Sequence, residues 1–361
     1  MYVVIIDKEV IMKSLKINKN NRFRILQLTD IQYDCDIDSA SMEVNDAVIA
    51  YASPDLIILT GDNVGGEFLF GAKKKALSIV KQVRDCYESK NIPWSTCFGN
   101  HDGMWSKHAK KHMMDVYLQG ENFIGGKDNV VGEKSLVCQT EDTYTNYFFP
   151  VCDNTGKAVY GIMLLDCATA VFSLYKGFYD SQQKFYDEIS KSYPDLPIVL
   201  FTHIPLKEMQ YAYDNRDNPE KVKAFVGEIE NPRKGKVYYA KKDVVQNGKF
   251  SQRLLNYANI KGVFVGHDHL ANFATVISMK EGYDMLAAYG RMSSYGMKAW
   301  KYVPFSCKDK KRYNAYLRGG RIVDLYADGS LSSVDLAYDR ESKTVKEYAK
   351  LTLSAQNAGK I

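Results

Sequence analysis

The sequence has 361 residues, of which 45% are hydrophobic and 25% are charged, so it can bury a sizeable core. Its formal net charge of +5 is small for this length, which argues against a dedicated nucleic-acid binder but suits a small anionic substrate. The seven cysteines form no Cys-x-x-Cys pair, and charged residues at 7–9 interrupt the apolar opening. We therefore expect reduced thiols, no membrane segment and a cytoplasmic location.

Short apolar runs alternate with longer stretches of helical period, which is typical of βαβ units. Strands are predicted at 23–30, 55–62, 94–102, 159–166, 197–203 and 261–269, and helices near 41–51, 72–89, 105–118, 180–192 and 250. Later short strands include a predicted hairpin with its turn at 327–329. We expect one α/β domain over 1–361, with a core at about 22–340 and a mixed sheet.

A long polar stretch at 204–250 exceeds an ordinary connection, so we interpret it as a lid or substrate loop. It contains NPRKGKVYYAKKD, one of two segments that interleave basic and aromatic residues; the other is residues 298–321. Such segments can hold phosphate groups or stack bases, but a solvated surface explains them equally well.

The stretch KGVFVGHDHLAN at 261–272 places two of the six histidines within three positions. An extended chain points alternate side chains the same way, so His267 and His269 can face one centre while Asp268 faces away. This geometry suits two imidazoles on a metal.

Polar residues also follow four earlier predicted strands. The candidates at these five strand ends are Asp30, Gln32, Asp62, Asn100, His101, Asp102, His203, His267 and His269. Ligands in open α/β sheets bind at carboxyl ends of strands, and most of these side chains are suitable metal ligands. The remaining histidines, His108 and His112, lack a metalloprotease glutamate and are interpreted as a solvated helix face.

The motifs GDN, GNHD, THIP and GHDH, in this order, resemble the metallophosphoesterase family, also called calcineurin-like phosphoesterases, over about residues 23–269. YDSQQKFYDEIS, HIPL, YGRMSSYG and GGRIVDL are similar to intracellular plant and fungal proteins related to purple acid phosphatases. The resemblance implies a four-layer αββα sandwich, in which helices flank two mixed β-sheets and a di-metal site lies at the strand ends.

The resemblance also implies roles for individual residues. Asp30 and His269 would hold one divalent ion (Mn, Fe, Zn or Mg), Asp62 would bridge, and Asn100, His203 and His267 would hold a second. His101 would protonate the leaving oxygen with Asp102 orienting it, and Asn100, His101 and Arg291 would contact substrate.

Two positions depart from the family pattern. Gln32 stands where most members have histidine, so its metal would gain only a neutral amide oxygen and bind more weakly. Val64, Gly65 and Gly66 follow Asn63 where purple acid phosphatases carry a tyrosine ligand, so no iron–tyrosinate centre is expected.

We therefore expect a metal-dependent phosphatase or phosphodiesterase that activates water between two metals and acts on a small phosphorylated substrate. A binding scaffold that lost turnover, for which Gln32 argues, and a nuclease, for which the basic segments argue, remain alternatives. The natural substrate and the oligomeric state are left open.

Overall fold

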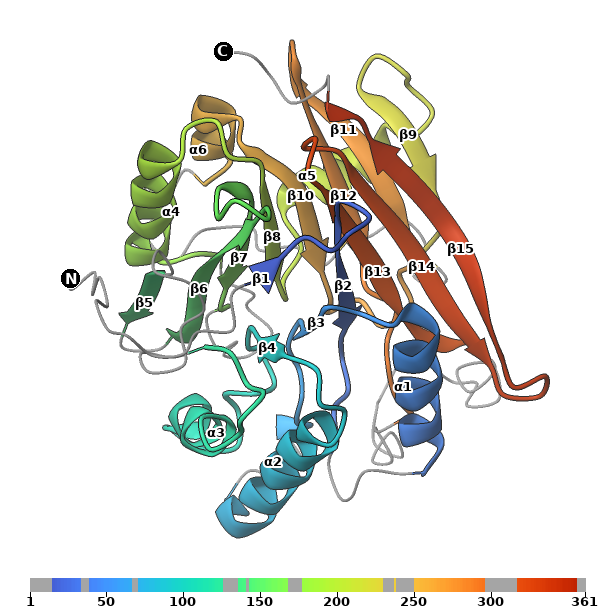
Figure 1. The fold of residues 1–361 in the computed structure, drawn as a ribbon. Helices are drawn as coiled ribbons and strands as arrows, with labels where there is room; N and C mark the ends of the chain where they lie inside the picture. The colour runs from blue at the N-terminus through green and yellow to red at the C-terminus, as the bar shows by residue number, and fades with distance from the viewer. Residues whose placement is uncertain are drawn as a thin grey trace.

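The computed structural model describes residues 15–33, 39–66, 71–125, 136–140, 143–167, 177–229, 237, 250–295 and 317–355; for 136–140 only the backbone is described. In this part of the chain, two β-sheets pack face to face, and helices lie on their outer sides (Figure 1). This arrangement confirms the predicted α/β fold with four layers and two mixed sheets.

The larger sheet has nine strands and a parallel centre. Its strands in spatial order are β1 (Leu15–Lys16), β6 (Thr143–Cys152), β7 (Ala158–Leu165), β8 (Ile198–Thr202), β10 (Ile260–Val265), β12 (Tyr283–Tyr289), β11 (Ala274–Lys280) and β9 (Val222–Val226), and β5 (Leu136–Thr140) pairs with β6. Strands β7, β8, β10 and β12 are parallel, whereas β9, β11 and β12 pair antiparallel.

Strand β8 shows why its sequence is a continuous apolar run. Ile198 and Leu200 pack into the cluster under the helices, while Val199 and Phe201 face the second sheet. Alternate side chains of a strand point to opposite faces, so a strand covered on both faces must be apolar throughout.

The smaller sheet has six strands. Their spatial order is β15 (Thr344–Leu353), β14 (Leu331–Asp339), β13 (Arg318–Tyr326), β2 (Arg22–Leu28), β3 (Leu56–Leu59) and β4 (Trp94–Thr96). Strands β2, β3 and β4 are parallel, and the others pair antiparallel. The turn between β13 and β14 has Gly329 at φ +84°, which confirms the predicted hairpin.

Among the described residues, three helices belong to each half of the sandwich. They are α1 (Ser39–Ala52), α2 (Lys73–Glu88) and α3 (Ala109–Tyr117) on the six-stranded side, and α4 (Asp180–Ser192), α5 (Lys207–Asp214) and α6 (Phe250–Tyr257) on the nine-stranded side. Helices α4 and α6 lie side by side (Figure 1), joined by an ion pair between Arg253 and Asp187.

Most helices form where periodicity predicts them, but the long connection differs. Residues 207–214 form α5, and residues 222–226 form β9 at the edge of the nine-stranded sheet. A single loop over 204–250 is therefore wrong for this part, because β9 gains backbone hydrogen bonds from β11 that a solvated loop would lack.

The two basic and aromatic segments fall mostly outside the described residues, which include only Val237 of the first and 317–321 of the second. Within the part of the chain that the structure describes, no helix has the length and apolar content needed to cross a membrane.

Candidate metal centre

The predicted ligands gather at one edge of the sandwich, after the carboxyl ends of strands from both sheets. Asp30 and Gln32 follow β2, Asp62 follows β3, Asn100 and His101 follow β4, His203 follows β8, and His267 and His269 follow β10. The parallel direction of these strands within each sheet brings the ends to a common edge, because no strand between them reverses.

The backbone of several predicted ligands is strained. Asp30, Gln32, Asp62 and His267 have positive φ angles of 53°, 43°, 51° and 77°. Non-glycine residues adopt this left-handed region rarely and at a cost, and such residues concentrate at functional sites. Backbone hydrogen bonds hold the first two loops in place, from the Asp30 amide to the Gly61 carbonyl and from the Gln32 amide to the Asp62 carbonyl.

Two glycines let the ligand loops approach each other. A Cβ atom on Gly99 would lie 2.1 Å from Oδ1 of Asp62, and one on Gly266 would lie 2.0 Å from Oγ1 of Thr29. Both distances are impossible contacts. The glycines of GNHD and GHDH are therefore required by close packing of loops around the centre.

Asp62 lies at the middle of the cluster. Its Oδ1 accepts a hydrogen bond from the backbone amide of His101 at 2.8 Å, and its Oδ2 accepts one from Nε2 of Gln32 at 3.2 Å. Ligand atoms of Asp62, His203 and His267 all lie within 4.8 Å of one another, the spacing that one metal ion needs.

The tautomer of His203 is set by its surroundings. Its Nδ1 lies 2.7 Å from the carbonyl oxygen of Thr60, which can only accept, so Nδ1 carries the hydrogen. The other nitrogen, Nε2, lies 3.1 Å from Oδ2 of Asp62. Metal-binding histidines commonly donate their second nitrogen to a carbonyl in this way.

Electrostatics at the centre favour a cation. Burial would lower the pKa of His203, but the negative charge of Asp62 raises it to about 9. Burial would likewise raise the pKa of Asp62, but His203 and His101 hold it below its usual range. Burial and the neighbouring His203 lower the pKa of His267 to about 3, which keeps this imidazole neutral and able to ligate.

Buried polar atoms without a hydrogen-bond partner test whether the residues fit a metal. Among the described residues these atoms include Oδ1 of Asp30, Oε1 of Gln32 and Oδ1 of Asn100. Buried polar groups are almost always satisfied, and a bound ion is one partner that can satisfy them. All three are oxygen donors of the kind that binds divalent metals, so the residues fit the implied ions.

Two of the ligands predicted for the first metal, Asp30 and His269, also lie close to each other. Oδ2 of Asp30 accepts hydrogen bonds from Oγ1 of Thr29 at 2.8 Å and from the backbone amide of His267 at 3.0 Å. Its Oδ1 lies 3.4 Å from Nε2 of His269. Asp30 thus links the ligand loop after β2 to the loop after β10.

His101 and Asp102 are placed differently from each other. The His101 side chain is 22% exposed, and its Nε2 lies 3.7 Å from Oδ2 of Asp62. Asp102 is fully buried and accepts hydrogen bonds from the backbone amides of Gly99, Asn63 and Val64. The carboxylate of Asp102 thereby joins the loops after β3 and β4, and its predicted role in orienting the His101 ring stays a prediction.

Arg291 is held by contacts with its surroundings. Its guanidinium binds Asp335, with Nη2 2.6 Å from Oδ2, and Nη1 donates to the Leu317 carbonyl. The side chain is 10% exposed. These contacts fix the loop that carries Arg291, and its predicted contact with substrate stays a prediction.

Sequence reasoning missed the serines of YGRMSSYG. Oγ of Ser293 accepts a hydrogen bond from the Thr29 amide, and Oγ of Ser294 donates one to the Ile31 carbonyl. These two hydrogen bonds hold the backbone on either side of Asp30 in the loop after β2. Within this motif the sequence predicts a role only for Arg291, because a charged side chain is a stronger signal in a sequence than a hydroxyl group.

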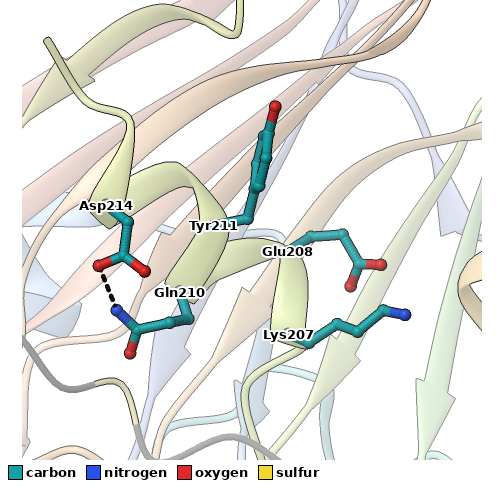
Figure 2. A pocket seen from close by; sticks show the side chains of 5 residues that line it. All are labelled: Lys207, Glu208, Gln210, Tyr211 and Asp214. Carbon is teal, nitrogen blue, oxygen red and sulfur yellow. Dashed lines mark hydrogen bonds between the residues drawn. The ribbon is translucent and has the colours of Figure 1, made fainter. Parts of the chain in front are cut away.

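One cavity of about 420 Å³ lies on α5 and is lined by Lys207, Glu208, Gln210, Tyr211 and Asp214. Lys207 and Glu208 point away from Gln210 and Asp214, which bond each other (Figure 2). None of these side chains is a predicted ligand, and they do not converge on a common point. The cavity is therefore not the candidate centre.

Comparison with known proteins shows the family to which the chain belongs. Residues 23–271 match the family model for calcineurin-like phosphoesterases. Two relatives from Arabidopsis thaliana, named probable inactive purple acid phosphatases 14 and 29, are each 26% identical; the first covers 80% of this chain and 75% of its own length, the second 72% and 70%. A solved structure, GAP50, the anchor in the inner membrane complex of Plasmodium, aligns over 93% of this chain and 92% of its own, with 16% identity and a TM-score of 0.48. The match of the family model over most of the chain shows that the protein belongs to the calcineurin-like phosphoesterase family.

Proposed function

We propose that the protein is a metal-dependent hydrolase of phosphoesters. The observation that carries this proposal is the set of buried oxygen donors around Asp62 that have no hydrogen-bond partner. Leaving such groups unsatisfied costs free energy, and divalent ions are the partners that suit all of them.

In the proposed hydrolysis, the ions and the side chains of the centre have different electrostatic roles. Two divalent ions, when bound, supply positive charge that activates water and neutralises the phosphoryl oxygens. Asp62 contacts Gln32 and His203 on two sides of the cluster, which supports its role as the carboxylate that would hold both ions. The hydrogen bond from His203 to Thr60 fixes that imidazole before any ligand arrives, which lowers the cost of organising the site.

His101 is the candidate acid for the leaving oxygen. It follows Asn100, whose side chain is almost fully buried, yet its own ring is partly exposed and can reach a substrate from the solvent side. Its amide donates to Oδ1 of Asp62, so this hydrogen bond ties the loop of the acid to the loop of the bridging carboxylate. A proton from His101 would go to the departing alkoxide or phenolate oxygen as the P–O bond breaks.

A binding scaffold is the second candidate, and two observations favour it. The Arabidopsis relatives carry names that call them probably inactive. In addition, Gln32 contributes a neutral amide where an imidazole would bind metal better, and its Nε2 is used on Asp62. The remaining donor set and the exposed His101 support turnover.

A direct assay separates the two functions. Protein loaded with Mn²⁺ is tested against p-nitrophenyl phosphate and bis-p-nitrophenyl phosphate, with protein treated with chelator as the control. We expect hydrolysis of at least one ester class that disappears on chelation and returns with added metal. Tight Mn²⁺ binding without hydrolysis of either ester would establish the scaffold, and equal hydrolysis by the chelated protein would reject the metal assignment.

A further inference from the structure

The loop that carries His267 and His269 begins with an unusual turn. Strand β10 ends at Val265, and the Asp268 amide then donates to the Gly266 carbonyl at 3.0 Å while His267 has φ +77°. A hydrogen bond two residues back around a positive φ defines the strained kind of γ-turn. The two histidines therefore diverge from a turn and do not alternate along an extended strand, which corrects the geometric reason given for the His-x-His pair.

A strained turn persists only where its surroundings hold it. One contact is the bond from the His267 amide to Asp30, and another comes from the neighbouring strand. The hydroxyl of Tyr289 donates to Oδ2 of Asp268 at 2.6 Å. Asp268 lies between the two histidines, so this bond acts on both at once.

Tyr289 is rigidly placed to make this bond. It ends β12 directly opposite Val265, the last residue of β10. The side chain is fully buried, and its ring meets Phe273 edge to face at 5.0 Å. Burial raises the pKa of Tyr289 well above its usual range, so the hydroxyl keeps its hydrogen and remains a donor.

We propose that Tyr289 is a positioning residue, which acts through Asp268 to hold His267 and His269 in the geometry that binds metal. The inference rests on the proposed function, because it assumes that these histidines are ligands. Tyr289 touches neither metal nor substrate in this role. It fixes the strained turn so that the imidazoles need no rearrangement when the ion arrives.

The same strand provides a matched control. Tyr283 begins β12, is also fully buried, and donates its hydroxyl to the Ile260 carbonyl at 2.8 Å, at the opposite end of β10. Tyr283→Phe and Tyr289→Phe each remove one buried hydroxyl of β12. Only Tyr289→Phe removes a hydrogen bond to the loop that carries the two histidines.

The test measures Mn²⁺ binding by titration calorimetry, with thermal unfolding of each metal-free protein alongside. We expect Tyr289→Phe to weaken binding about 10-fold or more, as losses of partners around metal ligands do. Tyr283→Phe should bind like the wild type, although both variants lose stability by a similar amount. Asp268→Asn keeps an acceptor oxygen and should retain binding, whereas Asp268→Ala should bind as weakly as Tyr289→Phe.

The effects of Tyr289→Phe and Asp268→Ala on Mn²⁺ affinity should also be non-additive, because both substitutions remove the same hydrogen bond. The double variant Tyr289→Phe/Asp268→Ala should bind no more weakly than either single variant. Equal affinity of Tyr289→Phe and wild type, or equal weakening by Tyr283→Phe, would overturn the positioning role alone. Failure of the wild type to bind Mn²⁺ would overturn this inference and the proposed function together.

Discussion

The six-stranded and nine-stranded sheets meet at the candidate metal centre, and each would supply a different kind of ligand atom. The loops after β2, β3 and β4 carry oxygen donors, namely Asp30, Gln32, Asp62 and Asn100. The loops after β8 and β10 carry imidazoles, namely His203, His267 and His269. Neither sheet alone has the mixed set, so the centre depends on how the sheets dock.

The two groups are also organised differently. The oxygen donors of Asp30 and Asp62 are almost completely buried and already accept hydrogen bonds from backbone amides. The ring of His203 is instead oriented by a carbonyl, and the histidine loop by a tyrosine. The loops of the six-stranded sheet (the oxygen side) therefore fix the position of the negative charge. The loops of the nine-stranded sheet (the nitrogen side) fix the orientation of the imidazole rings. Substitutions on each side, and at the contact between the halves, should show this division.

Asp62→Asn should have the largest effect. An amide cannot offset the repulsion between two cations as a carboxylate does, so we expect turnover to be lost while the fold is kept. Metal analysis should show reduced occupancy, and circular dichroism should match the wild type. A wild-type rate of hydrolysis by Asp62→Asn would contradict the bridging role. It would also show that Asp62 does not supply the negative charge that the centre needs.

His101→Ala tests the exposed residue on the oxygen side. General acid catalysis contributes about 10²–10⁴-fold where the departing oxygen needs a proton, so alkyl phosphates should lose far more rate than nitrophenyl phosphates. Metal content should stay the same, because the ring is not counted among the ligands. Equal losses on both substrate classes would show instead that His101 holds the substrate.

Lys110→Met tests the contact between the halves. Lys110 of α3 binds Asp166, which follows β7, with Nζ 2.7 Å from Oδ1 and side-chain exposures of 4% and 0%. Removing the lysine leaves a buried carboxylate uncompensated, so we expect a loss of about 3–5 kcal/mol in the free energy of unfolding, measured with urea.

The neighbouring lysine is the control for this experiment. Lys111 pairs with Asp115 at 3.0 Å on the exposed face of the same helix. Lys111→Met should cost only about 0.3–0.5 kcal/mol. Addition of Asp166→Asn to Lys110→Met should recover part of the loss, and similar losses for both lysines would show that the buried pair does not join the halves.

Gln32 should give the smallest change. Gln32→His would add an imidazole to the oxygen side, so half-maximal activity should need less free Mn²⁺, whereas Gln32→Ala should need more, by about tenfold at each step. The rate at saturating metal should change less. Identical metal dependence in all three proteins would mean that Gln32 only donates to Asp62 and is not a ligand.

Local patterns predicted much of this molecule. Apolar runs such as residues 197–203 identified parallel strands, and helical periods identified α2 and α4, because burial on both faces or on one stripe leaves a direct trace in the sequence. The motif glycines also indicated the loops that converge. Residues far apart in the chain could thus be assigned to one site before their distances were known.

Other features depend on partners that no local pattern reveals. The resemblance implied a role for Asp102 beside His101, but it did not reveal that Asp102 accepts hydrogen bonds from the amides of two neighbouring loops. The γ-turn at His267 and the bond from Tyr289 arise from the pairing of β10 with β12. Likewise, the polar sequence of residues 204–250 did not predict α5 and β9, because β9 is stabilised by its pairing with β11 at the edge of the sheet.

The position of β2 governs when this centre can assemble. This strand pairs with β3 on one side and with β13, nearly 300 residues later, on the other. A ribosome adds about 5–20 residues per second, so the strand that precedes Asp30 waits many seconds for its second neighbour. The ligand loops are therefore completed by some of the most distant contacts in the chain, which are the slowest to close. If the centre binds metal as proposed, loading must accordingly follow synthesis of β13.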